Sequence, residues 1–161
     1  MKKLNFLNIP GIKGESGNAD YANQVEVRDF EFGASQTGSF AANIGGGTGT
    51  VQVQDFSFTK FVDCASPLIF KAVATGQHFD KVTLSCTKAG NKQQTFMIVT
   101  FSNAMFSDYQ IGGAGNSEEP AVERIRLSFS KIEFKYCKQK NDGTLAGAIV
   151  ASYDMQKQFA A

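Results

Sequence analysis

One eight-residue pattern occurs twice in this chain, as Val-x-Val-x-Asp-Phe-x-Phe over residues 25–32 and again over residues 51–58. In each copy the apolar residues alternate with polar ones at the two-residue period of a β-strand, and the alternation slips by one residue at the Asp-Phe step. Such a slip turns the side chains to the other face of a sheet unless a bulge or a bend absorbs it. We therefore expect each copy to form one long, bent strand, and the two copies to form a hairpin.

The segment between the two copies, residues 33–49, is rich in glycine. It is much longer than the roughly 2–5 residues of a common hairpin loop, and loops of such length are usually functional or disordered. Ordering it would be costly, because glycine loses more conformational entropy than any other residue when its backbone becomes fixed. The sequence therefore predicts a hairpin with a long, flexible tip.

The composition indicates a single, mostly β domain. The 161 residues fit one domain, and 15 Phe with no Trp, beside many Val, Ile and Thr, favour strands over helices. Turn-forming residues separate the apolar runs at the spacing of a β-sandwich or barrel. The formal net charge of +1 provides no electrostatic basis for binding nucleic acid or an anionic membrane. Further strands are expected over 82–87, 94–101, 124–129, 132–136 and 147–153.

One helix is predicted, over about residues 66–75. Ser66 can cap its first free backbone N–H groups, Pro67 suits the first helical position, and Gly76 suits a left-handed stop. Between these boundaries only Lys71 and Thr75 are polar, so the helix is apolar nearly all round and more than one of its sides must be covered. In a monomer the barrel and loops would cover it, and in an oligomer a neighbouring subunit is the simpler cover. The residues assigned to a subunit interface are Leu68, Ile69, Ala72 and Val73.

No constellation of residues in the sequence indicates catalysis, a metal or a cofactor. His78 is the only histidine, so a two-histidine metal site cannot form, and we expect it to be a structural or surface residue. No Gly-x-Ser-x-Gly motif is present, and the glycine-rich segment 112–116 lacks the lysine of a phosphate-binding loop. We therefore expect a protein that is not an enzyme.

The N-terminus and the cysteines bear on where the protein folds. Asn5 and Asn8 interrupt what would be the apolar run of a signal peptide, and no segment approaches the ~20 apolar residues of a membrane helix. Cys64, Cys86 and Cys137 are widely spaced and odd in number, which is typical of a chain that folds in the reducing cytoplasm. Export, if it occurs, would not use a standard signal peptide.

The long run 53–78, VQDFSFTKFVDCASPLIFKAVATGQH, resembles the haemolysin-coregulated protein (Hcp) family, the tube subunits of type VI secretion systems. The resemblance extends to 9–16 near the start, to 82–84 followed by Lys-Ala-Gly at 88–90, and to 127–132 near the end. It therefore covers most of the chain in the order found in the family.

The resemblance implies a two-sheet β-barrel or sandwich with one flanking helix, similar to phage tail-tube proteins. Six copies would form a ring, and rings would stack into a hollow tube that carries effector proteins, with a tip spike, a sheath and a baseplate as partners. Such a protein is cytoplasmic when assembled and reaches the extracellular medium or a target cell without a signal peptide. The chain would be a single tube domain over 1–161, with no C-terminal effector extension.

Within such a tube we assign three sets of residues. The glycine-rich loop would contact the adjacent ring and become ordered on stacking, and Phe101 and Phe106 would face a neighbouring subunit. If the valines of the repeated pattern point inward, the polar residues that alternate with them would face the water-filled lumen. The inter-ring loop glycines are Gly33, Gly38, Gly45, Gly46, Gly47 and Gly49, and the lumen-facing candidates are Gln24, Glu26, Gln52 and Gln54.

Two alternatives remain open at the level of the sequence. The chain could be a tail-tube subunit of a phage-like contractile particle, which would assemble in the same way. It could also be a small, monomeric β-barrel hydrolase or ligand-binding module, although no residue constellation supports that function. A soluble monomer that binds a sugar or another small ligand would favour this second alternative.

Overall fold

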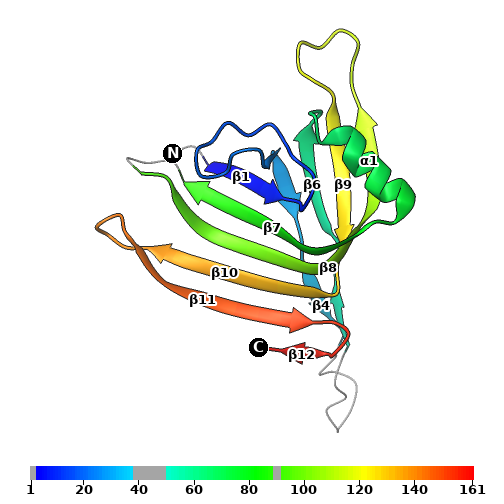
Figure 1. Cartoon of the computed structure of the whole chain (residues 1–161). Coiled ribbons are helices and arrows are strands. Elements are labelled where there is room, and N and C mark those ends of the chain that lie inside the picture. Colours follow the sequence, from blue (N-terminus) through cyan, green and yellow to red (C-terminus); the bar gives the residue numbers. More distant parts are fainter. Residues whose placement is uncertain (1–2, 38–49, 89–91) are drawn as a thin grey trace.

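The computed structural model describes residues 3–37, 50–88 and 92–161 (Figure 1). The predicted mostly β fold with one main helix is confirmed in these residues. In chain order the elements are β1 (Lys3–Asn8), β2 (Val25–Val27), β3 (Asp29–Glu31), β4 (Ala34–Gln36), β5 (Val51–Val53), β6 (Phe56–Phe61), α1 (Ser66–Thr75), β7 (His78–Lys88), β8 (Gln94–Gly112), β9 (Val122–Ser128), β10 (Lys131–Gln139), β11 (Leu145–Asp154) and β12 (Phe159–Ala160).

Successive antiparallel pairings close a barrel. Strand β1 pairs with β7, β7 with β8, β8 with β9, β9 with β6, and β6 with β3. Strand β3 continues from β2 through Arg28, and β2 pairs with β1 on its other side. The Arg28 amide donates a hydrogen bond to the Thr59 carbonyl at 2.9 Å, which holds this junction against β6.

The predicted hairpin of bent strands is present in the described residues. Strands β3 and β6 pair with Phe30 opposite Phe58, and farther out β4 and β5 pair with Ser35 opposite Gln52. The bend near Arg28 absorbs the slip in the pattern, because the first copy changes there from pairing with β1 to pairing with β6. Val25 and Val27, before the bend, and Phe30 and Phe32, after it, therefore all pack in or against the core.

Aromatic side chains fill much of the barrel. The ring of Phe56 lies 4.5 Å from that of Phe101, which in turn lies 4.8 Å from Phe129. Phe101 and Phe106 are fully buried, so the prediction that they face a neighbouring subunit is wrong. They stand on the inward side of β8, where Phe106 meets Phe79 at 5.5 Å between ring centroids.

Helix α1 spans the predicted residues 66–75, but Ser66 does not have the predicted capping role. Gly76 adopts a left-handed φ of 63° and closes the helix. Ser66, however, does not cap it, because Ser66 is already the first helical residue and its hydroxyl accepts a hydrogen bond from the Asp63 amide at 3.0 Å. The Asp63 carboxylate instead accepts the Ala65 amide at 2.9 Å. The cap-like carboxylate thus lies three residues before the predicted position.

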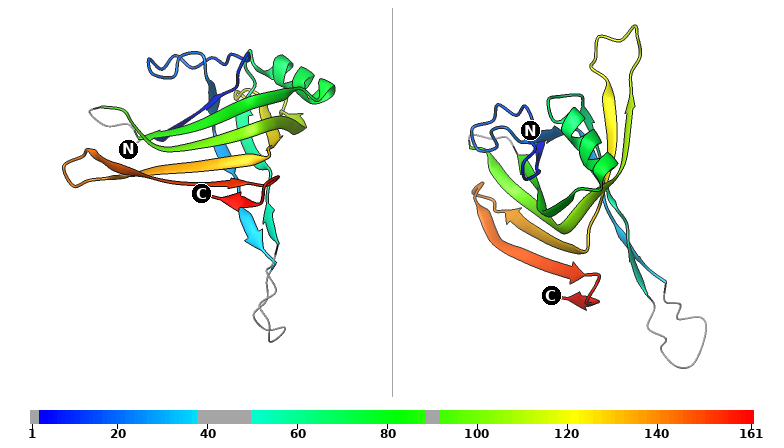
Figure 2. Two further views of the ribbon diagram at one scale, coloured as in Figure 1. Left: turned by 60° about the horizontal axis from the view of Figure 1, so that its bottom comes forward. Right: turned by 45° about the vertical axis from the view of Figure 1, so that its right-hand side comes forward.

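Three parts of the chain extend beyond the barrel (Figures 1 and 2). Strand β8 pairs with β10 along its first half and with β9 along its second, so β10, β11 and β12 continue the sheet past the barrel as a wing. Strands β4 and β5 form a projecting arm, and residues 113–121 form a loop that projects at the other end of the molecule. The barrel therefore presents a wing, an arm and a loop in different directions.

Candidate functional site and assembly surfaces

The wing exposes an apolar face that belongs to the core-facing side of the sheet. Register places Phe134 beside Val99 of β8, and Val99 is fully buried in the barrel. On β11, Ile149 lies beside Tyr136 and is 72% exposed. Only part of this surface is covered within the chain, since the Phe134 ring meets that of Phe32 at 5.8 Å between centroids. We call the set Ile132, Phe134, Tyr136, Ile149, Ala151 and Tyr153 the wing face.

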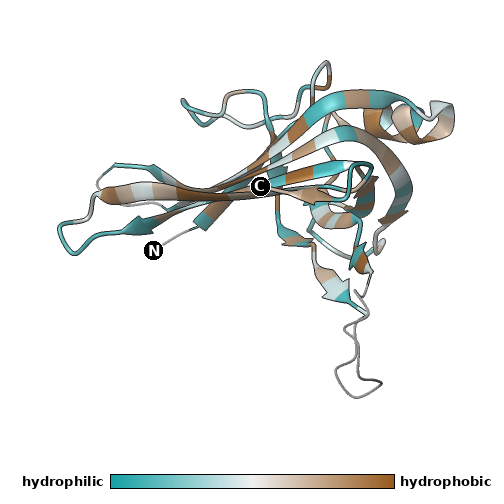
Figure 3. Ribbon diagram, turned by 90° about the horizontal axis from the view of Figure 1, so that it is seen from below, coloured by the Kyte–Doolittle hydropathy of each residue, from teal (hydrophilic) through white to brown (hydrophobic). Residues whose placement is uncertain are grey.

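The outer edge of the wing is also open. Strand β12 pairs only with Tyr153 and Asp154 at the end of β11, and residues 145–151 have no strand partner on that side among the described residues. These seven residues, LAGAIVA, carry no charge, and Figure 3 shows apolar residues in brown along the strands that lead to the C-terminus. A long, apolar edge strand readily pairs with another chain unless something covers it. The face and the edge of the wing together form a surface suited to a protein contact.

Helix α1 provides a second apolar surface, but a smaller one than predicted. Ile69 and Ala72 are fully buried in the barrel core of their own chain, so they cannot form an interface with a neighbour and that part of the prediction is wrong. The reason is that the core supplies the cover for this side of the helix. Leu68 and Phe70 are exposed, at 44% and 60%, and Val73 is half-buried. Phe70 was not in the predicted set, although it occurs in the same apolar run.

A buried polar network joins β6, β9 and the start of α1. The Lys60 ammonium is completely buried and donates hydrogen bonds to Glu123 Oε2 at 2.6 Å and to Asp63 Oδ1 at 2.8 Å. It also donates to Ser66 Oγ at 3.2 Å. Burial raises the pKa of Tyr109 far above its usual value, and the hydrogen bond that the Tyr109 hydroxyl donates to Glu123 raises it further. These contacts link β6 and β9 to Asp63 and Ser66, and they therefore fix the start of the helix on the barrel.

The outer face of β3, β6 and β9 is a polar wall. It carries Asp29 and Glu31 on β3, Ser57 and Thr59 on β6, and Arg124 and Arg126 on β9. These residues, with Gln54 and Asp55, line an open groove of about 680 Å³. The wall has no large apolar side chain among the exposed ones, unlike the wing face.

The predicted lumen-facing residues lie at different places. Gln54 lines the groove of the polar wall, Gln52 is exposed on the arm, and Glu26 is exposed beside a second groove of about 700 Å³. Gln24 does not fit the prediction, because it precedes β2 and its amide oxygen is buried without a hydrogen-bond partner in the described part of the chain. In the second groove the Arg28 guanidinium stacks over the Phe61 ring at 4.3 Å.

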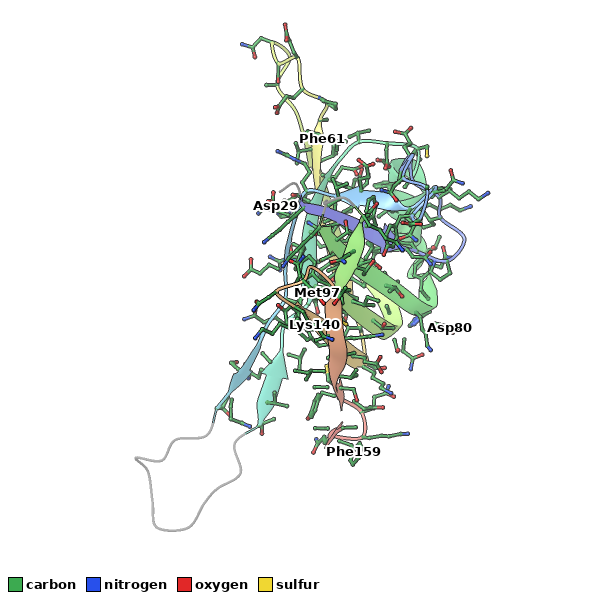
Figure 4. The ribbon with its side chains drawn as sticks, turned by 90° about the vertical axis from the view of Figure 1, so that its left-hand side faces the viewer. Asp29, Phe61, Asp80, Met97, Lys140 and Phe159 are labelled. Carbon is green, nitrogen blue, oxygen red and sulfur yellow. The ribbon has the colours of Figure 1, made fainter. Side chains whose placement is uncertain are left out.

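The arm carries the one inter-ring glycine that can be placed. Gly33 is half-buried at the base of the arm, where its carbonyl accepts a hydrogen bond from the backbone N–H of Gln54 at 2.8 Å. The other predicted glycines, Gly38, Gly45, Gly46, Gly47 and Gly49, lie outside the described residues. Figure 4 shows the arm at one end of the molecule, toward Phe159, whereas Phe61 lies near the 113–121 loop at the other end.

The residues with chemical reactivity are scattered. His78 is exposed at the start of β7, and the free thiols are Cys64 in the turn before α1, Cys86 on β7 and Cys137 on β10. Burial raises the pKa of Cys86 to about 11, which keeps this thiol protonated at neutral pH. In residues 3–37, 50–88 and 92–161, no group of three or more His, Cys, Asp or Glu side chains could hold a metal ion. No helix in the same ranges is long and apolar enough to cross a membrane.

The sequence matches the family described as "Type VI secretion system effector, Hcp" over residues 6–136. Protein hcp1 of Pseudomonas aeruginosa is 36% identical over 146 residues, which are 90% of each chain. A solved structure described as that of a type six secretion system protein superposes with a TM-score of 0.94 at 23% identity, covering 99% of this chain and 100% of the other. Hcp1 from Salmonella typhimurium gives a TM-score of 0.81 at 28% identity, with 100% of each chain covered. From its sequence and its fold together, the chain belongs to the Hcp family of type VI secretion proteins.

Proposed function

We propose that this chain is a structural, non-enzymatic subunit of a type VI secretion tube, in which six copies form a ring and rings stack into a hollow tube. The observation that carries the proposal is the wing face, a core-like sheet surface left uncovered within the single chain. Its exposed residues would be unfavourable in water and favourable against a second copy. A secretion tube requires such a contact between identical subunits.

The lateral contact would be head to tail. Figures 1 and 2 place the wing and helix α1 on different sides of the barrel, so the two apolar surfaces of one chain cannot cover each other. A contact that joins unlike surfaces of identical subunits closes into a ring when the rotation between them is right. We infer that the wing of one subunit covers the helix side of the next, with Leu68, Phe70 and Val73 in the contact. The open edge of β11 would be covered in the same contact.

The contact between rings would use the two ends of the molecule. The arm and the 113–121 loop project at opposite ends, as a stacked, heterologous contact requires. The glycine-rich segment that begins at Gly33 would reach the adjacent ring, and the entropic cost of ordering it would make stacking weak. Deleting residues 45–47 should therefore leave the ring intact and abolish tubes in electron micrographs. Unchanged tubes would contradict this role.

The polar wall would line the lumen. Of the predicted lumen residues, Gln54 lies on this wall and is exposed to water, which supports the proposal, whereas Glu26 and Gln52 are exposed elsewhere on the chain. A wall whose exposed side chains are polar would let effector proteins pass without strong apolar contacts. The tip spike, the sheath and the baseplate would be the further partners of such a tube, which would be assembled in the cytoplasm and then secreted.

Electron microscopy of the purified chain tests the proposal directly. We expect negative-stain images to show rings with a central hole, and short stacks of rings as the protein concentration rises. Particles without a hole would contradict it. A monomer that stays dispersed at high concentration would instead favour a β-barrel module that functions alone.

A further inference from the structure

Two arginine side chains project next to each other from the polar wall. Arg124 and Arg126 alternate along β9 with the buried residues Glu123, Ile125 and Leu127, so both point to the outer face. Being two residues apart on one strand, they lie about 7 Å apart along it. Neither forms an ion pair with any residue in the described ranges.

The neighbouring strands leave the guanidinium groups available. On β6, Thr59 and Ser57 stand opposite Arg124 and Arg126, and hydroxyl groups cannot neutralise them. On β8, Gln110 stands opposite Arg124 and Asp108 opposite Arg126, but Asp108 lies beyond ion-pair distance of the guanidinium group. The carboxylates of the same groove lie farther away or have other partners. Asp29 accepts the Thr59 hydroxyl at 3.1 Å, and Asp55 accepts the Ser107 hydroxyl at 2.9 Å.

We propose that Arg124 and Arg126 form an anion-binding site that takes pairs of carboxylate groups on an acidic segment of a protein carried past the polar wall. A guanidinium group presents its N–H donors in a fork that matches a carboxylate with two parallel hydrogen bonds. Carboxylates two residues apart on an extended segment, or four apart on a helix, are about 6–7 Å apart and match the spacing of the arginines. This inference rests on the proposed function, which turns the polar wall toward the lumen.

The charges around the site favour a protein ligand over a nucleic acid. The groove contains three carboxylates, Asp29, Glu31 and Asp55, against the two arginines, and a fourth, Asp108, stands opposite Arg126 on β8. A continuous polyphosphate chain would be repelled by these carboxylates along most of its length, because its charges are closely and evenly spaced. Carboxylates placed locally on a protein surface can meet the arginines and avoid the acids. Each exposed ion pair is weak, so retention would depend on the many copies of the site in a ring.

The test uses the full chain and a fluorescent peptide in which glutamate alternates with threonine, with a glutamine version as the reference. Binding is measured by fluorescence anisotropy, and the mass of each protein is measured by light scattering in the same buffer. The test variant combines Arg124→Gln and Arg126→Gln. The matched control combines Lys13→Gln and Lys140→Gln, which removes the same charge from exposed positions outside the polar wall.

We expect the wild-type chain and the lysine control to bind the glutamate peptide, and the arginine variant to bind it about tenfold more weakly. The glutamine peptide should not bind. Equal binding by the arginine variant and the wild type, or binding of the glutamine peptide, would overturn the site. A single-stranded oligonucleotide that displaces the glutamate peptide at lower concentration would overturn the choice of a protein ligand.

The mass measurement separates this inference from the proposed function. If the wild-type chain is monomeric but binds the glutamate peptide through its arginines, the anion site stands and the tube function fails. If rings form but binding does not depend on the arginines, the tube function stands and the anion site fails.

Discussion

At the scale of single residues, Lys60 and Glu123 occupy positions where the pattern of their strands calls for an apolar side chain. Lys60 continues the inward series of Phe56 and Phe58, and Glu123 precedes the inward pair Ile125 and Leu127. A charged residue in each inward series could have suggested a buried ion pair from the sequence. Their pairing could not be predicted, because it depends on the register between β6 and β9.

Replacing Lys60 with Met should lower the free energy of unfolding by about 3–5 kcal/mol, because it leaves Glu123 buried without its cation. Urea unfolding followed by circular dichroism measures the change. Lys140→Met, at an exposed turn, should stay within about 0.5 kcal/mol of the wild type. Adding Glu123→Gln to Lys60→Met should restore part of the loss. A loss below about 1 kcal/mol for Lys60→Met would show that the network contributes little.

The buried thiol of Cys86 should make stability depend on alkaline pH. Its pKa is raised from 9.0 to about 11 by burial, so the folded state favours the neutral thiol. That contribution is complete below about pH 9, and it is lost as the pH rises to about 11, because the unfolded thiol ionises first. The expected loss over this window is about 2–3 kcal/mol.

Urea unfolding at several pH values tests this with two alanine variants. Cys86→Ala should flatten the decline in the free energy of unfolding between about pH 9 and 11, whereas Cys64→Ala, at an exposed cysteine, should not. The same slope in Cys86→Ala and the wild type would assign the decline to other groups. Tyr109 titrates in all three proteins, so its contribution cancels in the comparison.

At the scale of elements, helix α1 shows what an apolar sequence can and cannot predict. Its bounds follow from Pro67 and Gly76, which act through local backbone geometry. Which of its apolar residues face the chain's own core cannot be predicted in this way, because a helix that is apolar all round gives no periodicity to choose a face. The same limit explains why Ile69 and Ala72 were assigned to an interface.

Alanine substitutions in α1 should separate its two faces. Ile69→Ala should lower the free energy of unfolding by about 2–5 kcal/mol, because it leaves a cavity in the core. Leu68→Ala should leave the unfolding of the separated subunit within about 0.5 kcal/mol of the wild type but weaken the ring. Thermal unfolding and light scattering of both variants measure these effects. Equal loss of stability in the two variants would contradict the burial of one face alone.

The wing is the part of the fold that the sequence predicts least well. A strand was expected over 147–153, but nothing in the local pattern shows that β10 and β11 leave the barrel, since this depends on β8 being long enough to pair with β9 and β10 at different points. The pattern of β10 does alternate, and Phe134 and Tyr136 read as ordinary core residues. Their exposure becomes evident only when the closed barrel is known.

Placing a charge on the wing face should prevent ring closure without unfolding the subunit. Ile149→Asp puts a carboxylate at a position that is 72% exposed in the single chain, so the subunit should fold normally. In a ring the same carboxylate would be buried without a partner, which is strongly unfavourable. Light scattering should show a smaller species for Ile149→Asp and an unchanged one for Asn116→Asp, on an exposed loop. A ring of normal mass in Ile149→Asp would exclude the wing face from the contact.

At the scale of the whole molecule, the two bent copies of the repeated pattern account for the hairpin and its arm. The mostly β class, the hairpin and the helix were predictable, since each depends on residues close in the sequence. The closure of the barrel and the three projections were not, because they depend on pairings between distant strands. Most of the surfaces we assign to assembly lie on these projections or on the outer wall, and helix α1 adds its exposed side, which is why the predicted site residues were only partly right.

The proposed ring is tested most directly by the mass of the purified wild-type chain, measured by light scattering after size exclusion at several concentrations. A ring of six copies predicts a species of six times the 17.4 kDa subunit, about 104 kDa, that persists on dilution. A species of 17.4 kDa at every concentration would contradict it, because the wing face would then be stable in water and the proposed ring would have no basis.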